Sequence, residues 1–402
     1  MVEPIVCNRK CAKKAVHLRP LQSLNSICGK LPFLLIVSIF LFFITACSPP
    51  PRVSAQERIF PKISLELLDT YEIPANKFQD TLVGGLSAIT YDRQQDRYYA
   101  LSDDRSNQAP ARFYTLKVDI QQSDEGEITL KNIEIEKVTF LRDETGEKYS
   151  AGTIDGEGIA LSPRRTLFIA SEGNPTQNVP PFVGEFDLDG RKILDITIPQ
   201  RFLVAAEENK GIRDNLAFES LSVNQTGLLK DDPFRLFIAT ESALKQDLSE
   251  ADADRIRFLH YAINSVGNPI LVAEHLYLLE PVGIDAISHG LTELLVLEKQ
   301  GYFLSLERTF GFTGVGAKIF QVAVNNATDT STFDSLQEIS GIQPLRKNLV
   351  LDLQDLDIYL DNLEGMTLGS RLPDGSHSLI LISDNNFNDE QVTQLLLFRL
   401  SP

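Results

Sequence analysis

Acidic side chains stand at nearly the same place in five similar phrases of the sequence. Each phrase opens with a short apolar strand and continues with a second apolar strand that ends on Asp or Glu. The acids that end the second strand are Asp103, Glu172, Glu241, Glu298 and Asp384. In three copies a further glutamate directly precedes the first strand, and these residues are Glu157, Glu219 and Glu364. Carboxylates in such numbers can bind metal ions and orient water for hydrolysis.

These acids can form one site only if the fold brings distant repeats together. The spacing of the repeats indicates the fold class. Strand pairs recur every roughly 60 to 80 residues, a period typical of propeller blades and longer than most solenoid repeats. The first four copies each extend to four runs rich in β-branched and aromatic residues, bounded by Gly, Asp, Asn and Pro. The sequence therefore predicts an all-β propeller of about five four-stranded blades.

The last copy is one strand short, whereas residues 63–68 form a strand-like run with no blade of its own. Pairing this N-terminal strand with the last blade closes the ring and removes both exposed edges. The alternative is a sixth, degenerate blade hidden between residues 324 and 364. For the fourth blade we expect strands at residues 284–287, 293–297, 302–307 and 318–324.

A closed ring points all eight acids at one mouth of the central channel, because both repeated positions fall on the same rim. Carboxylates in this confined space must be neutralised by cations or stay partly protonated. Hard oxygen ligands at variable spacing favour calcium over zinc. The expected ligands are Glu157, Glu172, Glu219, Glu364 and Asp384, with Asp103, Glu241 and Glu298 in addition. The alternative interpretation is that each acid caps its own blade by accepting backbone N–H bonds.

The catalytic candidates are the three glutamates before the innermost strands, Glu157, Glu219 and Glu364. Basic residues lie near these acids in the sequence and are candidates for substrate binding, namely Arg105, Arg213 and Lys299. Arginine makes bidentate contacts to phosphate or carboxylate, so these residues suit a small anionic ester. Ion pairing with the neighbouring acids is the alternative role.

Other catalytic signatures are absent from the sequence. It contains no Gly-x-Ser-x-Gly elbow, which argues against a serine esterase of the α/β-hydrolase type. The histidines after residue 47 have no metal-ligand spacing and avoid the repeated rim positions. A histidine-dependent phosphatase and a Gly-rich nucleotide site are therefore not predicted.

The N-terminal residues predict export and a lipid anchor. Basic residues and an apolar run over residues 31–44 lead to Ile44-Thr45-Ala46-Cys47, which resembles the bacterial lipobox with Cys47 as the lipidated residue. We expect a signal peptide at residues 1–47, a tether at 48–60 and the propeller domain at 61–402. The protein would then be lipid-anchored to a bacterial membrane and face the periplasm or the exterior. A retained signal anchor is the alternative.

The net charge of the chain restricts the classes of partner that are expected. The formal net charge is −17, and residues 47–402 carry 54 acidic and 32 basic residues. Nucleic acid and anionic membrane surfaces are poor partners for this balance, so membrane contact is expected through the anchor alone. All four cysteines lie at or before Cys47, so no disulfide is available to the propeller domain.

Five phrases in a fixed order carry a family resemblance. They are Gly-Gly-Leu-Ser-Ala-Ile at 84–89, Asp155-Gly156-Glu157-Gly158-Ile159, Glu219-Ser220-Leu221, Asn362-Leu363-Glu364-Gly365-Met366 and Leu381-Ile382-Ser383-Asp384-Asn385-Asn386. With them the chain resembles the phytase-like family, called esterase-like activity of phytase, over about residues 80–400. The resemblance implies a secreted β-propeller and a hydrolase activity. The Asp-Asp-Pro-Ala opening of calcium-dependent β-propeller phytases is missing, so phytate is not implied as the substrate.

Three functions remain open from the sequence. The first is a calcium-assisted hydrolase of phosphate or carboxylic esters at the acidic rim. The second is a non-catalytic propeller that binds a partner on the same rim, since one fold hosts many functions. The third is a lactonase-like enzyme in which a few acids hold one calcium ion.

Overall fold

The computed structural model describes residues 59–204, 209–227, 229–248, 254–283, 285–312, 314–337 and 339–402. The predicted signal peptide, Cys47 and nearly all of the tether lie outside these residues. The complete helices within them are four short 3-10 turns: η1 (Pro175–Gln177), η2 (Gln200–Phe202), η3 (Lys245–Asp247) and η4 (Leu353–Leu356). No helix in these ranges has the length and apolar character needed to cross a bilayer.

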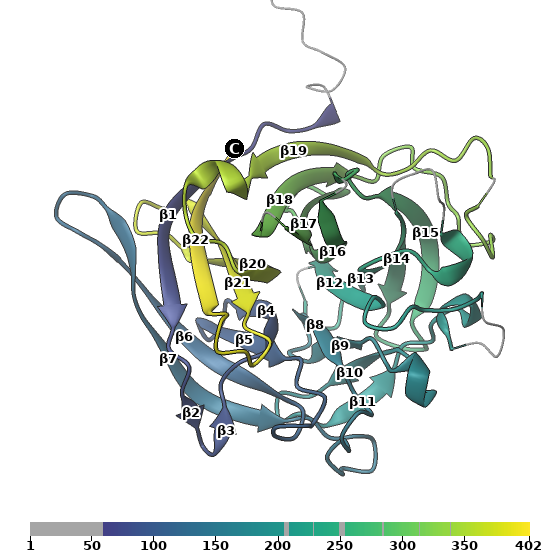
Figure 1. The fold of residues 1–402 in the computed structure, drawn as a ribbon, viewed down its shortest axis with the longest axis horizontal. Helices are drawn as coiled ribbons and strands as arrows, with labels where there is room; N and C mark the ends of the chain where they lie inside the picture. Colours follow the sequence, from purple (N-terminus) through teal and green to yellow (C-terminus); the bar gives the residue numbers. More distant parts are fainter. Residues whose placement is uncertain are drawn as a thin grey trace, which may run out of the picture. The chain divides into compact units, whose positions relative to one another are not determined.

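Antiparallel four-stranded sheets form the blades of a propeller around a central axis (Figure 1). Blade one consists of β4 (Leu86–Asp92), β5 (Arg97–Ser102), β6 (Arg112–Gln122) and β7 (Ile128–Phe140). Blade two consists of β8 (Gly156–Leu161), β9 (Leu167–Ser171), β10 (Phe182–Phe186) and β11 (Lys192–Asp195). Blade three consists of β12 (Phe218–Gln225), β13 (Phe234–Thr240), β14 (Arg255–Ile263) and β15 (Ile270–Leu278).

The remaining strands complete the ring. Blade four consists of β16 (Ala286–Val296), β17 (Tyr302–Gly311), β18 (Gly314–Ala323) and β19 (Arg346–Asp352). Blade five consists of β20 (Asn362–Arg371), β21 (His377–Asp384), β22 (Thr393–Ser401) and, outermost, β1 (Ser64–Ile73). A small hairpin of β2 (Lys77–Phe78) and β3 (Thr81–Leu82) lies outside the blades. The prediction of an all-β propeller with five blades is confirmed.

The second strand of each blade has an apolar centre because neighbouring blades cover both of its faces. In β9, the sequence LFIAS is buried at every position. Five apolar clusters fill the spaces between neighbouring blades in the described residues. Continuous apolar runs of this length are typical of strands buried on two sides. These clusters hold the innermost strands at a fixed distance from the axis.

The ring closes through a strand pair that joins the two ends of the propeller domain. β1 pairs antiparallel with β22, from Ser64 opposite Ser401 to Ile73 opposite Thr393. Its side chains pack into two interblade clusters, with Leu65 and Leu67 in one and Leu68 and Ile73 in the other. The predicted closure by an N-terminal strand is confirmed, and the strand is longer than residues 63–68.

Blade four differs from its prediction. The expected strands at residues 284–287 and 293–297 fall largely within one long strand, β16. Ile284 lies outside the described residues, and Asp285 and Leu297 flank the strand. Each later strand of the blade therefore moves one place inward, and β19 supplies the outer strand. The stretch considered for a sixth blade instead provides β19, and the six-blade alternative is wrong.

Removing β1 tests the closure. Burial of one Leu or Ile side chain stabilises a fold by about 1.5–3 kcal/mol, so losing this strand should remove about 5 kcal/mol or more. That loss is comparable to a typical total stability of about 5–15 kcal/mol. We therefore expect a chain that starts at residue 74 to be largely unfolded by circular dichroism, whereas a chain that starts at residue 59 should melt cooperatively. A shortened chain with an unchanged melting temperature would contradict this role of β1.

Candidate functional site

Each innermost strand carries a β-bulge at the same level of the channel. The bulged residues are Ser87, Glu157, Glu219, Thr292 and Glu364, where the register to the second strand shifts by one residue. A bulge inserts one extra residue and re-aims its side chain. The three predicted glutamates thus occupy one repeated structural position. In blades one and four this position holds a hydroxyl side chain, Ser87 or Thr292.

The second strands contribute another ring of equivalent positions. In each blade, one residue of the second strand pairs with the residue that precedes the bulge. The residue that directly follows this partner in the sequence occupies the equivalent position in every blade: Asp103, Glu172, Glu241, Arg308 and Asp384. Four of these are acids that the repeats predicted. In blade four the position holds Arg308. The sequence pattern did not predict this residue, because residues 293–297 were expected to form the second strand but belong largely to the innermost strand β16.

Two predicted residues lie elsewhere. Glu298 follows the innermost strand β16 rather than a second strand, so it leaves the blade at the opposite end. Its side chain is 76% exposed and lies 3.5 Å from His377 (Oε1 to Nε2). The neighbouring Lys299 places its ammonium 4.6 Å from the centre of the Tyr302 ring. The predictions that Glu298 and Lys299 lie at the acidic mouth are wrong.

The other predicted acids meet in one cavity of about 400 Å³ at the mouth of the channel. The ionisable groups that line it are Asp103, Asp155, Glu157, Glu172, Glu219, Glu241, Glu364, Asp384, Arg105 and Arg308, together with Asp104. Asp104 is paired with the buried Arg112 (Oδ2 to Nη1, 2.7 Å). The remaining eight carboxyl groups face two guanidinium groups, so full ionisation would leave six negative charges without a partner.

Several of these carboxylates are close enough to share one ion. Three sets of three residues have oxygen atoms within 4.8 Å of one another: Asp155, Glu157 and Glu172; Glu157, Glu219 and Glu364; Glu172, Glu219 and Glu241. Asp155 stands two residues before Glu157 in the second repeat and was not among the predicted ligands. Its signal was present in the sequence as the first residue of Asp155-Gly156-Glu157.

Some of the acids also accept backbone hydrogen bonds, as the capping interpretation expects. Glu172 accepts one from the amide of Ala217, and Asp384 accepts one from the amide of Asn386 (2.9 Å). Ala217 directly precedes β12 of blade three, so Glu172 caps the neighbouring blade rather than its own. Capping and metal binding are compatible, because a carboxylate has two oxygens with several lone pairs.

Burial and mutual repulsion keep the cavity's acids from ionising readily. Burial and then the charge of Glu219 raise the pKa of Glu157 well above its usual range. Burial raises the pKa of Glu364 to about 8, although the charge of Arg308 opposes the shift. Burial also raises the pKa of Asp384 to about 6. Like charges in a low-dielectric site disfavour the ionised forms, so a cation would stabilise this arrangement.

The two arginines of the cavity pair with different acids. Arg105 lies 2.6 Å from Asp155 (Nη2 to Oδ2), and its side chain is 31% exposed. Arg308 is more buried and lies 3.1 Å from both Glu241 and Glu364. Arg213 does not line the cavity; its Nη1 donates to Ser242 (2.7 Å) beside Glu241. Of the predicted substrate-binding residues, only Arg105 reaches the cavity.

The donor set fits a hard divalent cation. All candidate ligands are carboxylate oxygens, which calcium prefers and which suit zinc less well. Asp103 Oδ1 is buried and has no hydrogen-bond partner among the described residues. Gly85 leaves space beside this atom, since a Cβ there would lie 2.0 Å from it. The acidic clusters therefore have the composition of a metal site.

Below the mouth, Glu293 extends into the channel from β16. The equivalent positions of the other four blades hold small residues: Ala88, Gly158, Ser220 and Gly365. It is buried, and its Oε1 accepts hydrogen bonds from the amides of Leu294 (2.8 Å) and Leu221 (3.3 Å). Burial raises its pKa well above the usual range. The side chain links the innermost strands of blades three and four just below the bulges.

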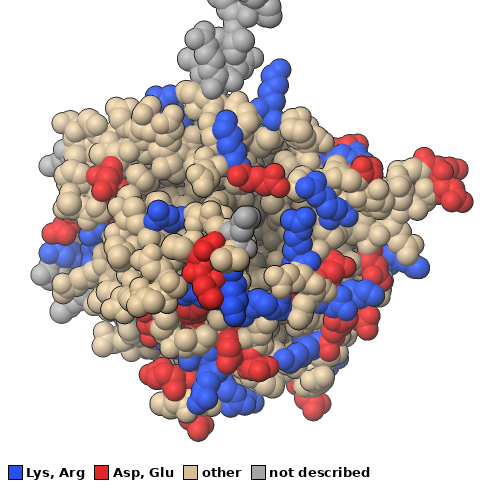
Figure 2. Space-filling model, turned by 180° about the vertical axis from the view of Figure 1, so that it is seen from behind, with Lys and Arg blue, Asp and Glu red and all other residues tan. Residues whose placement is uncertain are grey.

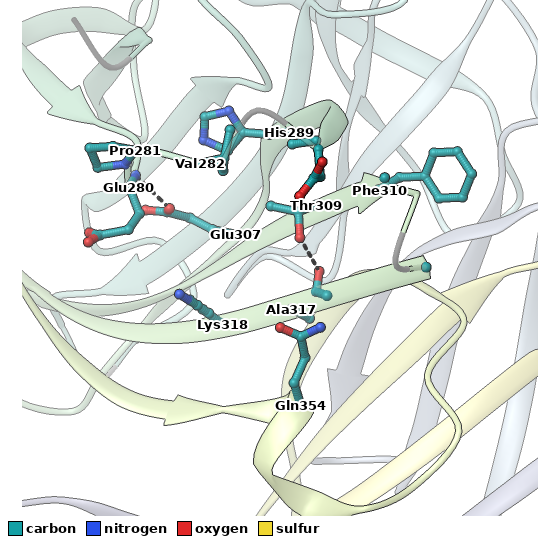
Figure 3. Close-up of a pocket in the computed structure, with 16 residues that line it drawn as sticks. Glu280, Pro281, Val282, His289, Glu307, Thr309, Phe310, Ala317, Lys318 and Gln354 are labelled. Atoms are coloured by element: carbon teal, nitrogen blue, oxygen red, sulfur yellow. Dashed lines mark hydrogen bonds between the residues drawn. The ribbon is translucent and has the colours of Figure 1, made fainter.

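A second cavity, of about 270 Å³, lies on the other face of β17 (Figure 3). Glu307 and Thr309 line it, whereas Arg308 between them lines the acidic cavity. The Glu307 carboxylate accepts hydrogen bonds from the Tyr277 hydroxyl (2.5 Å), the Glu280 amide (2.9 Å) and Lys347 (2.6 Å). This carboxylate is satisfied and takes no part in the acidic mouth.

Charge at the mouth differs from charge on the outer surface. On the face shown in Figure 2, Lys and Arg side chains are interspersed with Asp and Glu, and neither sign dominates. Within the cavity, acids outnumber arginines by a wide margin. The imbalance is therefore local to the mouth when compared with that face.

The raised pKa values predict how stability depends on pH. Glu364 (about 8) and Asp384 (about 6) bind protons more tightly in the folded chain than in the unfolded chain. The free energy of unfolding of metal-free protein should then fall as the pH rises from about 4.5 to about 8. In EDTA we expect a melting temperature roughly 5 °C lower at pH 8 than at pH 5. Glu364→Gln should reduce this difference; a melting temperature that rises with pH would contradict the shifts.

Similarities to solved structures are distant. The catalytic domain of Coprinopsis cinerea GH62 α-L-arabinofuranosidase is 10% identical with a TM-score of 0.37, over 84% of this chain and 96% of that one. The Neurospora crassa Pan2 WD40 domain is 9% identical with a TM-score of 0.31, over 83% and 95%. The tail fibre of Staphylococcus aureus phage P68 is 12% identical with a TM-score of 0.30, over 84% and 53%. Scores this low support no functional argument.

No curated protein matches the chain. The family model described as Phytase-like, esterase-like activity of phytase, matches residues 81–387. This span contains all eight acids of the mouth and both of its arginines. The chain therefore belongs to the Phytase-like family, described as esterase-like activity of phytase.

Proposed function

We propose that the protein is a calcium-assisted hydrolase of small anionic esters, acting at the acidic mouth of the propeller. The observation that carries this proposal is the single cavity in which eight carboxyl groups and two guanidinium groups converge. Membership of the family is consistent with either a hydrolase or a binding propeller. A partly exposed arginine beside clustered acids favours an anionic ligand that arrives together with a cation.

The proposed calcium ligands are those carboxylates that belong to two of the three close sets, Glu157, Glu172 and Glu219. Asp155, Glu364 and Glu241 each complete one of the three sets. Bound there, calcium would supply positive charge that neutralises the acids and polarises a phosphoryl or carbonyl oxygen.

Arg105 is placed to bind the anionic group of the substrate. Its Nη2 holds Asp155 and Asn215, and the side chain lines the cavity and is 31% exposed. The five N–H donors of arginine allow it to keep the ion pair and still bind phosphate or carboxylate. Glu364, whose pKa burial raises to about 8 in the metal-free ring, is the candidate among these acids for proton exchange with water.

A binding module without turnover is the competing function. The same cavity would then hold a cation and an anionic ligand without hydrolysing it. A lactonase-like reaction is a third outcome, because it needs only a few of the acids around one calcium ion. A screen of phosphomonoesters, carboxylic esters and lactones, with calcium or with EDTA, separates the three. Turnover that EDTA abolishes supports hydrolysis, and its substrate class identifies the reaction; absence of turnover on all three classes favours binding alone.

Calcium should stabilise the folded ring, because it binds the assembled acids and not the open chain. At a calcium concentration 100 times the Kd the gain is about 2.7 kcal/mol. We expect the melting temperature in millimolar calcium to exceed that in EDTA by several degrees. Glu219→Gln should shrink this difference, since it removes one carboxylate from two of the close sets.

Glu127→Gln is the matched control, because Glu127 is exposed on the hairpin between β6 and β7. This variant should show the same calcium-dependent shift as the wild type. If calcium leaves the melting temperature of the wild type unmoved, the acids act as strand caps and the metal part of the proposal is wrong.

We also propose that the protein is exported and anchored through a lipid on Cys47. The Ile-Thr-Ala-Cys tetrad at the end of the apolar run supports this. Cys47→Ala should block processing and leave a longer precursor, which can be measured by immunoblot of membrane and soluble fractions. Ser48→Ala is a suitable control and should process normally. Unchanged size and membrane association of the Cys47 variant would contradict lipidation.

A further inference from the structure

Arg308 breaks the symmetry of the acidic ring. At the equivalent position the other four blades carry Asp103, Glu172, Glu241 and Asp384. Blade four places a positive charge where a fifth acid would complete the set. The substitution therefore changes the local charge by two units relative to the repeat.

The guanidinium of Arg308 binds carboxylates from both neighbouring blades. Nη2 lies 3.1 Å from Glu241 of blade three, and Nη1 lies 3.1 Å from Glu364 of blade five. Nη1 also donates to the Oδ1 atom of Asn362. Burial alone would lower the pKa of Arg308, but Glu364 and Glu241 raise it above its usual value. The group thus lies among oxygens from separate strands, as a bound cation would.

The neighbouring backbone leaves room for this arrangement. Gly290 of β16 pairs directly with Arg308. A Cβ at Gly290 would lie 2.3 Å from Glu241 Oε1, the oxygen that Arg308 holds. A side chain there would displace the carboxylate from the guanidinium.

We propose that Arg308 is a built-in cation that takes the place of one divalent ion in the acidic ring. It holds oxygens of Glu241 and Glu364, each of which belongs to one of the three close sets. Exchangeable ions are thereby confined to the side of the ring formed by Asp155, Glu157, Glu172 and Glu219. That calcium binds on this side of the ring rests on the proposed function. That Arg308 excludes an ion from Glu241 and Glu364 does not depend on whether the protein is an enzyme.

The physical reason is competition for the same oxygens. Arginine stays charged at every accessible pH and is covalently attached, so it neutralises Glu241 and Glu364 without free metal. Without Arg308, Glu241 and Glu364 would lose the guanidinium that lies between them, and the charge that also acts on Glu219 would be gone. Clustered oxygens of this kind are ligands for calcium.

The test is the number of calcium ions bound per chain, measured by isothermal titration calorimetry and by equilibrium dialysis. Arg308→Met removes the charge while keeping a long apolar side chain, and should bind one ion more than the wild type. Arg308→Lys keeps the charge and should bind the same number as the wild type. Equal numbers for wild type and Arg308→Met would overturn the proposal.

Folding of the Arg308→Met variant gives a second measurement. It should melt at a lower temperature than the wild type in EDTA, and calcium should raise its melting temperature by more than it raises that of the wild type. A variant that stays unfolded even in millimolar calcium would contradict the proposal, because an ion could not then replace the guanidinium. A wild type that binds calcium but shows no turnover would reject the hydrolase and leave this inference intact.

Discussion

The arrangement of this protein depends on holding many like charges together against their repulsion. Eight carboxyl groups share one cavity with two guanidinium groups, and burial raises the pKa of several of the acids. Such a cluster cannot persist on a flexible scaffold, since the chain would relax to separate the charges. The five interblade clusters and the pairing of β1 with β22 provide the rigid ring that opposes this repulsion.

The β-bulges of the innermost strands direct glutamate side chains into the cavity. In a regular strand successive side chains alternate between the two faces, and here both faces of each blade pack against neighbours. One extra residue at Glu157, Glu219 and Glu364 allows a carboxylate to leave this alternation and line the cavity. Glu293 lies directly below and bonds the amide two residues after Glu219, which ties the bulge of blade three to blade four.

Departures from the repeat divide the mouth into two unlike sides. Ser87 and Thr292 replace glutamates in blades one and four, and Arg308 replaces an acid in blade four. One side therefore has acids held by Arg308, while the other has the set of Asp155, Glu157 and Glu172 with Arg105 at its margin. A ring of identical blades would have no preferred place for an asymmetric ligand, whereas this one distinguishes its two sides.

Local patterns in the sequence predict the strands of every blade except blade four, together with the five blades, the closing strand and seven of the eight acids of the mouth. These follow from local patterns: apolar runs bounded by turn residues, repeated with an acid at each end. The strands of blade four and the remaining residues of the mouth could be assigned only from the tertiary structure, because the blade to which a strand belongs depends on its pairing with other strands. In blade four the acid after an apolar run, Glu298, lies at the far end, since that run is the end of the innermost strand. Arg308 reaches the mouth for the same reason, and no local pattern marks it, because its position is defined only by its register opposite Gly290.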